Sequence, residues 1–236
     1  MAHHFFNPSI FNRFDWAYSS MAEQGTHNPV VAGSSPAGPT ILGSASGVFV
    51  TRVWTKQHVA VLEQLKSNGR YVAKRKFVQN DLDGDAELMA VAYDYLVKFH
   101  PHLDLKPTDA EVPVWLSFSL DATMQPTPEC AILEFKIPEE LITSINIAKW
   151  GKVLNYSYIP VDDADLKAHR EKMAQYRVGD AEAVMSRFYP ELRAEITQSW
   201  KRLFDDNVKV GNDLAYGLVW EVKLEWLMSV QQSDSI

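Results

Sequence analysis

Three stretches of the chain carry polar or aromatic side chains with useful chemistry at alternate positions of an apolar pattern. These positions are Arg52 and Trp54 in VFVTRVWT, Ser117 and Ser119 in VWLSFSL, and Glu221, Lys223 and Glu225 in LVWEVKLEWLM. A guanidinium can bind an anion through its fork of N–H donors. A carboxylate can stabilise positive charge that develops during a reaction. The same residue types also line any solvated strand face, where Glu, Lys and Glu in a row form a surface charge ladder.

Clusters of aspartate and histidine raise the question of metal binding. The acidic run Asp81 to Asp85 lacks the glycine position and the closing glutamate of a calcium loop, so Asp83 or Asp85 is expected to cap the following helix. His100 and His102 flank a proline, but no further ligand lies near them, and zinc sites use three or four. We therefore predict no metal site and expect these two histidines to be solvated.

Other reactive residues stand alone. His169 lies on the apolar stripe of a predicted helix, which favours a hydrogen-bonded core residue over a catalyst. Cys130 is the only cysteine, so no disulfide forms within the chain and a reducing compartment is expected. The basic run Arg70 to Lys76 is expected to be a solvated face. The sequence contains no GxSxG, P-loop, HExxH or GxGxxG motif.

The segments that must position these residues show two periods. Four have the period of two that is typical of strands: Val48 to Thr55, Val112 to Leu120, Cys130 to Ile137, and Leu218 to Met228. The second and third are separated only by a break rich in proline and threonine, so we expect them to pair. The fourth is predicted to be one continuous strand with a buried face.

Helical spacing of apolar residues predicts helices before and after the central strands. They cover Lys56 to Ser67, Ala86 to Phe99, part of Glu139 to Asn155, a segment introduced by Asp162 and Asp163, Ala181 to Phe188 with Asp180 as its cap, and a last helix with Pro190 in its first turn. Asn68-Gly69 suits a left-handed C-terminal cap. A brief edge strand is expected over Tyr156 to Ile159.

The first 47 residues have no sustained period, and glycine, serine and proline crowd their second half. This composition is typical of a disordered tail. The stretch Met21 to Thr40 also looks like translated transfer-RNA gene sequence, because its GSSP can be encoded by a T-arm. We hypothesise that the true start lies near Val48, or that the reading frame runs out of a neighbouring transfer-RNA gene, a common integration site of mobile islands.

Composition limits the classes of protein to which the chain can belong. The chain has 236 residues, 46% of them hydrophobic, and a formal net charge of −7. It can bury a sizeable core, and its acidity argues against coating nucleic acid or an anionic membrane. No apolar run reaches the length of a membrane helix, about 18 residues, so a cytoplasmic protein is expected. Together with the periodic segments, this predicts an α+β fold. We expect a single domain, 48–230, with a central mixed, mostly antiparallel sheet covered by helices, and a C-terminal tail, 231–236.

Five motifs in order resemble a known family. They are WTKQ from Trp54, LEFKIPEELI from Leu133, KWGKVLN from Lys149, SWKRLFD from Ser199 and WEVKLEW from Trp220. Together they resemble the uncharacterised bacterial family known as domain of unknown function 3841, over about 48–230. The resemblance implies one domain that begins near Val48, and it carries over no catalytic residue.

A more distant likeness is to ADP-ribosyltransferases, NAD-using enzymes of mixed α/β build. One branch has an arginine on the first strand, a Ser-x-Ser pair on a middle strand and a glutamate motif on a later one. The likeness implies that Arg52 binds the pyrophosphate of NAD and that Trp54 lies beside Arg52 in the cofactor site. It implies that Ser117 and Ser119 orient the ribose, and that a glutamate holds a ribose hydroxyl. Glu221 and Glu225 are the candidates, but three residues separate them where the enzymes usually have one.

Two hypotheses about function follow. The leading one is an NAD-using, ADP-ribosyltransferase-like protein of a mobile or defence island, with Glu221 or Glu225 as the catalytic carboxylate. The alternative is a non-enzymatic binding or regulatory module with an aromatic groove for a protein or nucleotide partner. The first requires Arg52, Ser117 and a glutamate to converge on one cleft, because they must contact the same bound molecule.

Overall fold

The structure is a computed structural model, and it describes residues 41–42, 49–75, 86–123 and 125–233. All of them belong to one unit, Pro36–Ile236. The acidic run 81–85, with its predicted cap, lies outside the described residues. So does the predicted tail 1–47, apart from Ile41–Leu42, which forms a short strand on the main sheet.

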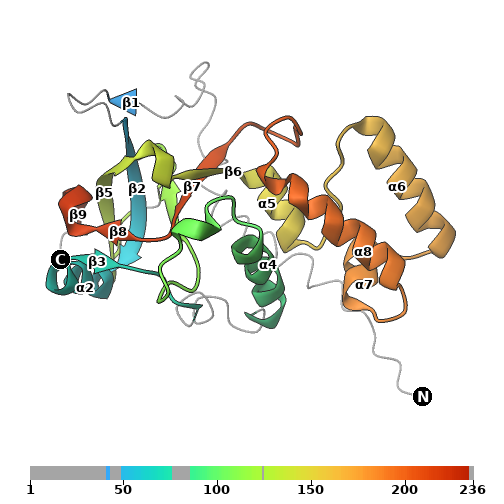
Figure 1. Cartoon of the computed structure of the whole chain (residues 1–236), viewed down its shortest axis with the longest axis horizontal. Helices are drawn as coiled ribbons and strands as arrows, with labels where there is room; N and C mark the ends of the chain where they lie inside the picture. Colours follow the sequence, from blue (N-terminus) through green and yellow to red (C-terminus); the bar gives the residue numbers. More distant parts are fainter. Residues whose placement is uncertain (1–40, 43–48, 76–85, 124, 234–236) are drawn as a thin grey trace. The chain divides into compact units, whose positions relative to one another are not determined.

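The fold is α+β, as predicted, and is built on one large antiparallel sheet (Figure 1). Its strand order is β6 (Thr143–Asn146), β7 (Ala215–Val219), β4 (Val114–Ser117), β2 (Val50–His58), β5 (Cys130–Pro138) and β9 (Leu227–Gln231), with β1 (Ile41–Leu42) paired to β2. A second, two-stranded sheet joins β3 (Arg70–Tyr71) to β8 (Val222–Lys223). Every pairing between these strands is antiparallel.

The predicted pairing of the two central strands is wrong, because β2 lies between β4 and β5. All nine residues of β2 pair with β5, from Val50 opposite Pro138 to His58 opposite Cys130. The four-residue β4 pairs with the other edge of β2, through Trp54 and Ser117. The long first strand therefore takes the place between two segments that are neighbours in sequence.

The predicted continuous strand from Leu218 to Met228 is also wrong. After Val219 the chain leaves β4, pairs with β3 as β8, forms the 3₁₀ helix η6 (Leu224–Trp226) and joins β5 as β9. Val219 and Val222 nevertheless bury their side chains in the same apolar cluster. The predicted buried face does not continue beyond the break, because Leu224 and Met228 are 37% and 51% exposed.

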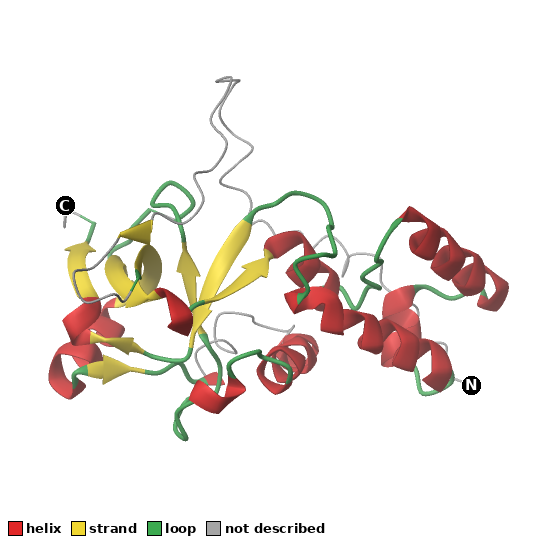
Figure 2. Ribbon diagram, turned by 45° about the horizontal axis from the view of Figure 1, so that its top comes forward, coloured by secondary structure: helices red, strands yellow, loops and turns green. Residues whose placement is uncertain are grey.

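The helices agree with the helical spacing in most places. They are α2 (Val59–Asn68), α4 (Ala86–Lys98), α5 (Ile147–Leu154), α6 (Asp163–Tyr176), α7 (Asp180–Met185) and α8 (Pro190–Ser199), with 3₁₀ segments η3 (Leu103–Leu105), η4 (Glu139–Leu141) and η5 (Trp200–Phe204). Figure 2 shows α6, α7 and α8 gathered beyond the β6 end of the sheet.

Local signals located several helix ends correctly. Gly69 ends α2 in the left-handed conformation, at φ 73°, and Asp162 caps α6 by accepting from Asp165 N–H. Asp180 does not cap α7, because Gly179 is the cap residue and the Asp180 carboxylate is bound elsewhere. No strand forms over 156–159, and the segment 139–155 contains β6 as well as the helix α5.

One face of the large sheet forms the main core. Val53, Leu116, Leu133 and Phe135 are at most 1% exposed, and they cluster with the fully buried Leu65 of α2. On the opposite face, helices cover the sheet over β4, where Trp115 lies 5.5 Å from Trp150 of α5 between ring centroids. On β2 the side chains of that opposite face are the even-numbered ones, because neighbours along a strand point to opposite sides.

Candidate functional site

Arg52 lies on the face of β2 that is opposite the main core, and it is exposed. Its Nε donates to Oε1 of Glu134 on β5 over 2.5 Å, and the hydroxyl of Ser229 on β9 donates to the other carboxylate oxygen over 2.7 Å. Arg52 on β2 and Ser229 on β9 thus both bind the Glu134 carboxylate on β5, the strand between them. This carboxylate fixes the position of the Arg52 guanidinium. We name Arg52, Trp54, Glu134 and Lys136 the Arg52 face.

The two partners differ in exposure. The Glu134 side chain is 11% exposed, and the Arg52 side chain is 48% exposed. The hydrogen bond from Arg52, assisted by Ser229, holds the pKa of Glu134 below its usual range against the effect of burial. The hydrogen bond that Arg52 makes to Glu134 uses Nε, which leaves the two terminal nitrogens of this exposed side chain able to bind another group.

Trp54 and Lys136 complete this face. The Arg52 Cζ lies 5.1 Å from the Trp54 ring centroid, and Lys136 is the cross-strand partner of Arg52. Two cations on directly opposed positions repel each other. One buried carboxylate between them lessens that repulsion and leaves the face locally basic, on a chain whose formal net charge is −7.

Ser117 and Ser119 close a turn at the end of β4. Ser117 Oγ donates to the carbonyl of Ser119 over 2.6 Å and accepts from the Ser119 N–H over 3.2 Å. Ser119 Oγ in turn accepts from the Asp121 N–H. Ser117 is opposite Trp54 in register, so it lies close to the Arg52 face, but its hydroxyl is used by the turn.

The two glutamates lie elsewhere. Glu221 accepts from Arg70 over 3.0 Å and lies 3.6 Å from the Lys223 ammonium. Arg70 also binds Asp109, so the basic run is partly paired rather than simply solvated. Glu225 is exposed, within η6.

Both glutamates lie in the segment between β7 and β9, which packs Val222 and Trp226 against the face of the sheet that carries Val53. The side chain of Arg52 lies on the other face. The structure thus brings Arg52 and Trp54 together, with Ser117 opposite Trp54 in register. Glu221 is instead bound to Arg70.

One further expectation about a side chain is corrected. His100, expected to be solvated, is 4% exposed, and its ring lies 4.6 Å from that of Trp220. Burial, with a smaller effect of His102, lowers the pKa of His100 to about 4, so this histidine is neutral at physiological pH.

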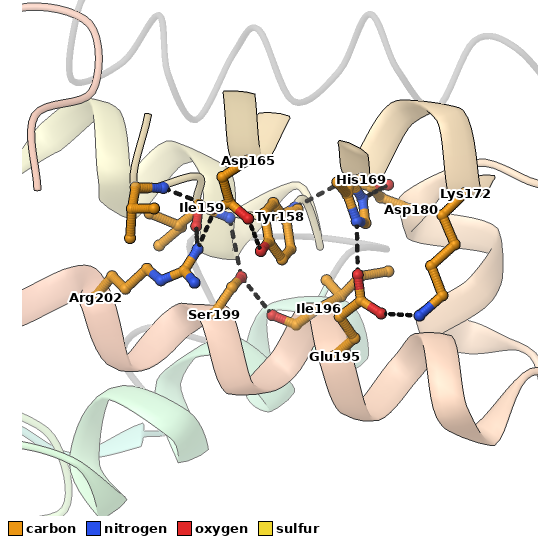
Figure 3. A network of polar contacts seen from close by, with 11 residues as sticks. Tyr158, Ile159, Asp165, His169, Lys172, Asp180, Glu195, Ile196, Ser199 and Arg202 are labelled. Carbon is orange, nitrogen blue, oxygen red and sulfur yellow. Dashed lines mark hydrogen bonds and ion pairs between the residues drawn. The ribbon is translucent and has the colours of Figure 1, made fainter. Parts of the chain in front are cut away.

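A second polar cluster joins α6 to α7 and α8 (Figure 3). We name it the His169 network; it comprises Tyr158, Asp165, His169, Lys172, Asp180, Glu195 and Arg202. His169 Nε2 lies 2.8 Å from Asp180 Oδ1, and its Nδ1 lies 3.2 Å from Glu195 Oε1. Lys172 donates to the other oxygen of Glu195. The prediction that His169 is a hydrogen-bonded core residue is confirmed, because its side chain is 4% exposed.

Tyr158 and Arg202 extend the network. The Tyr158 ring stacks on His169, with centroids 4.0 Å apart and planes 7° from parallel. Its hydroxyl donates to Asp165 over 2.8 Å, and its N–H donates to Asp180 over 2.8 Å. Arg202 donates to the same Asp165 carboxylate over 2.9 Å. Each of these side chains is hydrogen-bonded to another member of the network. The network therefore joins the helices to one another, and it offers no nucleophile that is free to react.

The protonation states follow from the partners. Burial lowers the pKa of His169, but the hydrogen bonds and charges of Asp180 and Glu195 together raise it above its ordinary value. Burial raises the pKa of Asp180, but the His169 hydrogen bond and the Tyr158 N–H bring it below its usual range. The geometry therefore favours an imidazolium between two carboxylates.

A family model described as Domain of unknown function (DUF3841) matches residues 52–228. The chain belongs to this family. No curated protein and no solved structure matches the chain. The matched range begins at Arg52 and includes both the Arg52 face and the His169 network.

Sequence reasoning missed the partners that define both clusters. Glu134 could have been found, since it is the acidic residue in CAILEFKI, a segment that is otherwise mostly apolar. Asp180 and Glu195 left no local signal, because they lie 11 and 26 residues from His169.

Among the described residues, no three His, Cys, Asp or Glu side chains are grouped so that they could hold a metal ion. None of the described helices combines the length and the apolar character needed to span a membrane.

Proposed function

We propose that this chain is a binding module for an anionic, nucleotide-like ligand of the NAD or ADP-ribose class, and that the ligand binds on the Arg52 face. The observation that carries the proposal is the way Arg52 is held. Glu134 binds its Nε, and the Arg52 side chain is 48% exposed. An arginine held in this way is preorganised to form paired hydrogen bonds with a phosphate or pyrophosphate group.

The electrostatics of the face support an anionic ligand. Glu134 is itself held by Ser229, so it orients the guanidinium from below the surface and is shielded from an incoming anion. Lys136, across from Arg52, supplies a second cation. A phosphate placed between the two would relieve the repulsion that their opposed positions impose.

Trp54 supports a ligand that is aromatic as well as anionic. It is half-buried, and Arg52 lies beside its ring. An indole next to a phosphate-binding cation can stack on a nucleobase or nicotinamide ring, and such stacking contributes about 1–3 kcal/mol per base. The expected roles of Arg52 and Trp54 in ligand binding are thus kept in the proposal. Ser117 and Ser119 contribute by shaping the neighbouring turn.

The geometry supports binding better than ADP-ribosyl transfer. Transfer from NAD needs a carboxylate near the ribose to favour the positively charged state as nicotinamide leaves. Glu221 is bound to Arg70 of β3, Glu134 is bound to Arg52, and Glu225 is exposed in η6. The non-enzymatic module is therefore the function we put forward.

Calorimetric titration of the full chain with NAD, ADP-ribose and pyrophosphate tests the proposal. We expect binding of at least one of them, and a loss of affinity of about tenfold or more in Arg52→Gln, because a bidentate charged contact is removed. The matched control is Arg170→Gln, an exposed arginine on α6 that should leave affinity unchanged. Absence of binding by all three ligands, or equal affinity in Arg52→Gln, would refute the proposal.

An assay of nicotinamide release from NAD separates the two functions. The binding module should release none above the uncatalysed rate. Release that disappears in Glu221→Gln or Glu225→Gln, with NAD affinity retained, would show instead that the chain is an enzyme, because such a carboxylate acts chiefly in the transition state.

A further inference from the structure

The helix α6 is attached to its neighbours mainly by polar contacts. Of its fourteen residues, only His169 and Met173 are buried. Its remaining ties are charged: Asp165 binds Arg202 and Tyr158, and Lys172 binds Glu195. A helix with so little apolar burial separates from its neighbours more easily than one that forms part of a core.

His169 is the central tie, and both of its ring nitrogens face carboxylate oxygens, one from α7 and one from α8 (Figure 3). Only the doubly protonated ring has an N–H for each carboxylate. A neutral ring would turn a nitrogen lone pair toward either Asp180 or Glu195, and the buried site would lose that hydrogen bond.

The charges around the ring also favour its doubly protonated form. The groups that face it are Asp165 and Lys172 of α6, Tyr158 before α6, Asp180 of α7, Glu195 of α8 and Arg202 of η5, while Lys152 of α5 acts on Asp180. Asp165 is balanced by Arg202, and Glu195 by Lys172. Asp180 makes its charged hydrogen bond to His169, and Lys152 acts on it only through space, so most of its balancing charge is lost when His169 loses its second proton.

We infer that α6 can separate from α7 and α8, and that a proton on His169 stabilises its closed position. When the ring loses that proton, the tie to α7 or to α8 is lost and the opening of α6 becomes easier. Opening carries Asp165 away from Tyr158 and Arg202, and so exposes an aromatic ring and a guanidinium that α6 otherwise occupies. The inference does not depend on the Arg52 face or on the ligand proposed for it.

Amide hydrogen exchange of the full chain tests the separation of α6. Protection of α6 is compared with that of β5 at pH about 6 and about 9, after correction for the intrinsic pH dependence of exchange. We expect the protection of α6 relative to β5 to fall about tenfold or more over this range in the wild type. His169→Gln should show low protection of α6 at both values. The control Glu171→Gln, which alters an exposed carboxylate of the same helix, should behave as the wild type.

Because His169→Gln replaces a buried side chain and can itself disturb the packing of α6, the protonation of His169 is also measured directly in the wild type. Long-range proton–nitrogen spectra at neutral pH should show both nitrogens of His169 protonated. A single protonated nitrogen at neutral pH would overturn the inference. So would exchange of α6 that follows β5 across the whole pH range.

Discussion

The sheet and the helix α6 are held in place by different forces. In the sheet, apolar residues such as Phe135 and Ile137 are fully buried, and the main polar cluster, the Arg52 face, lies on the surface. In the helical region a histidine is buried between two carboxylates, and α6 adds little apolar surface. Apolar burial depends little on pH, whereas an ionic tie depends on every proton it contains. The sheet should therefore be the rigid frame, and α6 the part that responds to conditions.

Phe135→Ala should have the largest effect. Its side chain is fully buried in the main core, and truncation of such a residue destabilises a protein by about 3–5 kcal/mol. Urea unfolding measures the change in the free energy of unfolding. Phe188→Ala, at a residue that is 77% exposed between α7 and α8, is the control and should change it by no more than about 0.5 kcal/mol. Equal effects would contradict the contrast between the two regions.

Glu195→Gln should have a smaller effect, confined to the helical region. It weakens the contacts of both His169 and Lys172, and loss of such a charged hydrogen bond costs about 1–3 kcal/mol. Limited proteolysis at near-neutral pH should cut the α6 region sooner in this variant, while the sheet stays resistant. The exposed Glu171→Gln should not change the cleavage rate.

The pH dependence of stability should also separate the two regions. Because the pKa of His169 is raised in the folded state, its contribution is complete below the ordinary pKa of histidine, about 6.5, and is lost as pH rises through the raised value. Because the pKa values of Asp180 and Glu195 are lowered, their contribution is present above the ordinary carboxylate range and is lost as pH falls.

Denaturation at several pH values measures this effect. Relative to His169→Gln, the wild type should be less stable at about pH 9 than at about pH 6. If the difference between the two chains is the same at both values, the pKa of His169 is not raised in the folded protein.

Removal of the first 40 residues should have the smallest effect. Their composition offers too little periodic apolar surface to offset an ordering entropy of about 1–2 kcal/mol per residue, so the melting temperature should move by no more than about two degrees. Deletion to residue 47 also removes β1, which pairs with Thr51 and Val50 of β2. A larger loss of stability in the longer deletion would show that this short strand protects the start of the central strand.

The sequence by itself determined the features that depend on neighbours along the chain. Apolar spacing predicted α4, the Asp162 cap and the Pro190 start of α8, because helix periodicity and capping act within a few residues. The α+β class and the family membership also followed from segments that can be read one at a time.

Only the tertiary structure decided which segments became partners. A period of two shows that one face of a strand is buried, but it does not specify the neighbouring strand, so β2 could separate β4 from β5 and the last strand could break without a change in pattern. The partners of Arg52 and His169 were hidden for the same reason. Glu134 lies 82 residues from Arg52, and Glu195 lies 26 residues from His169. Contacts at such separations arise when the chain folds, because long-range packing, rather than local spacing, brings the charges together.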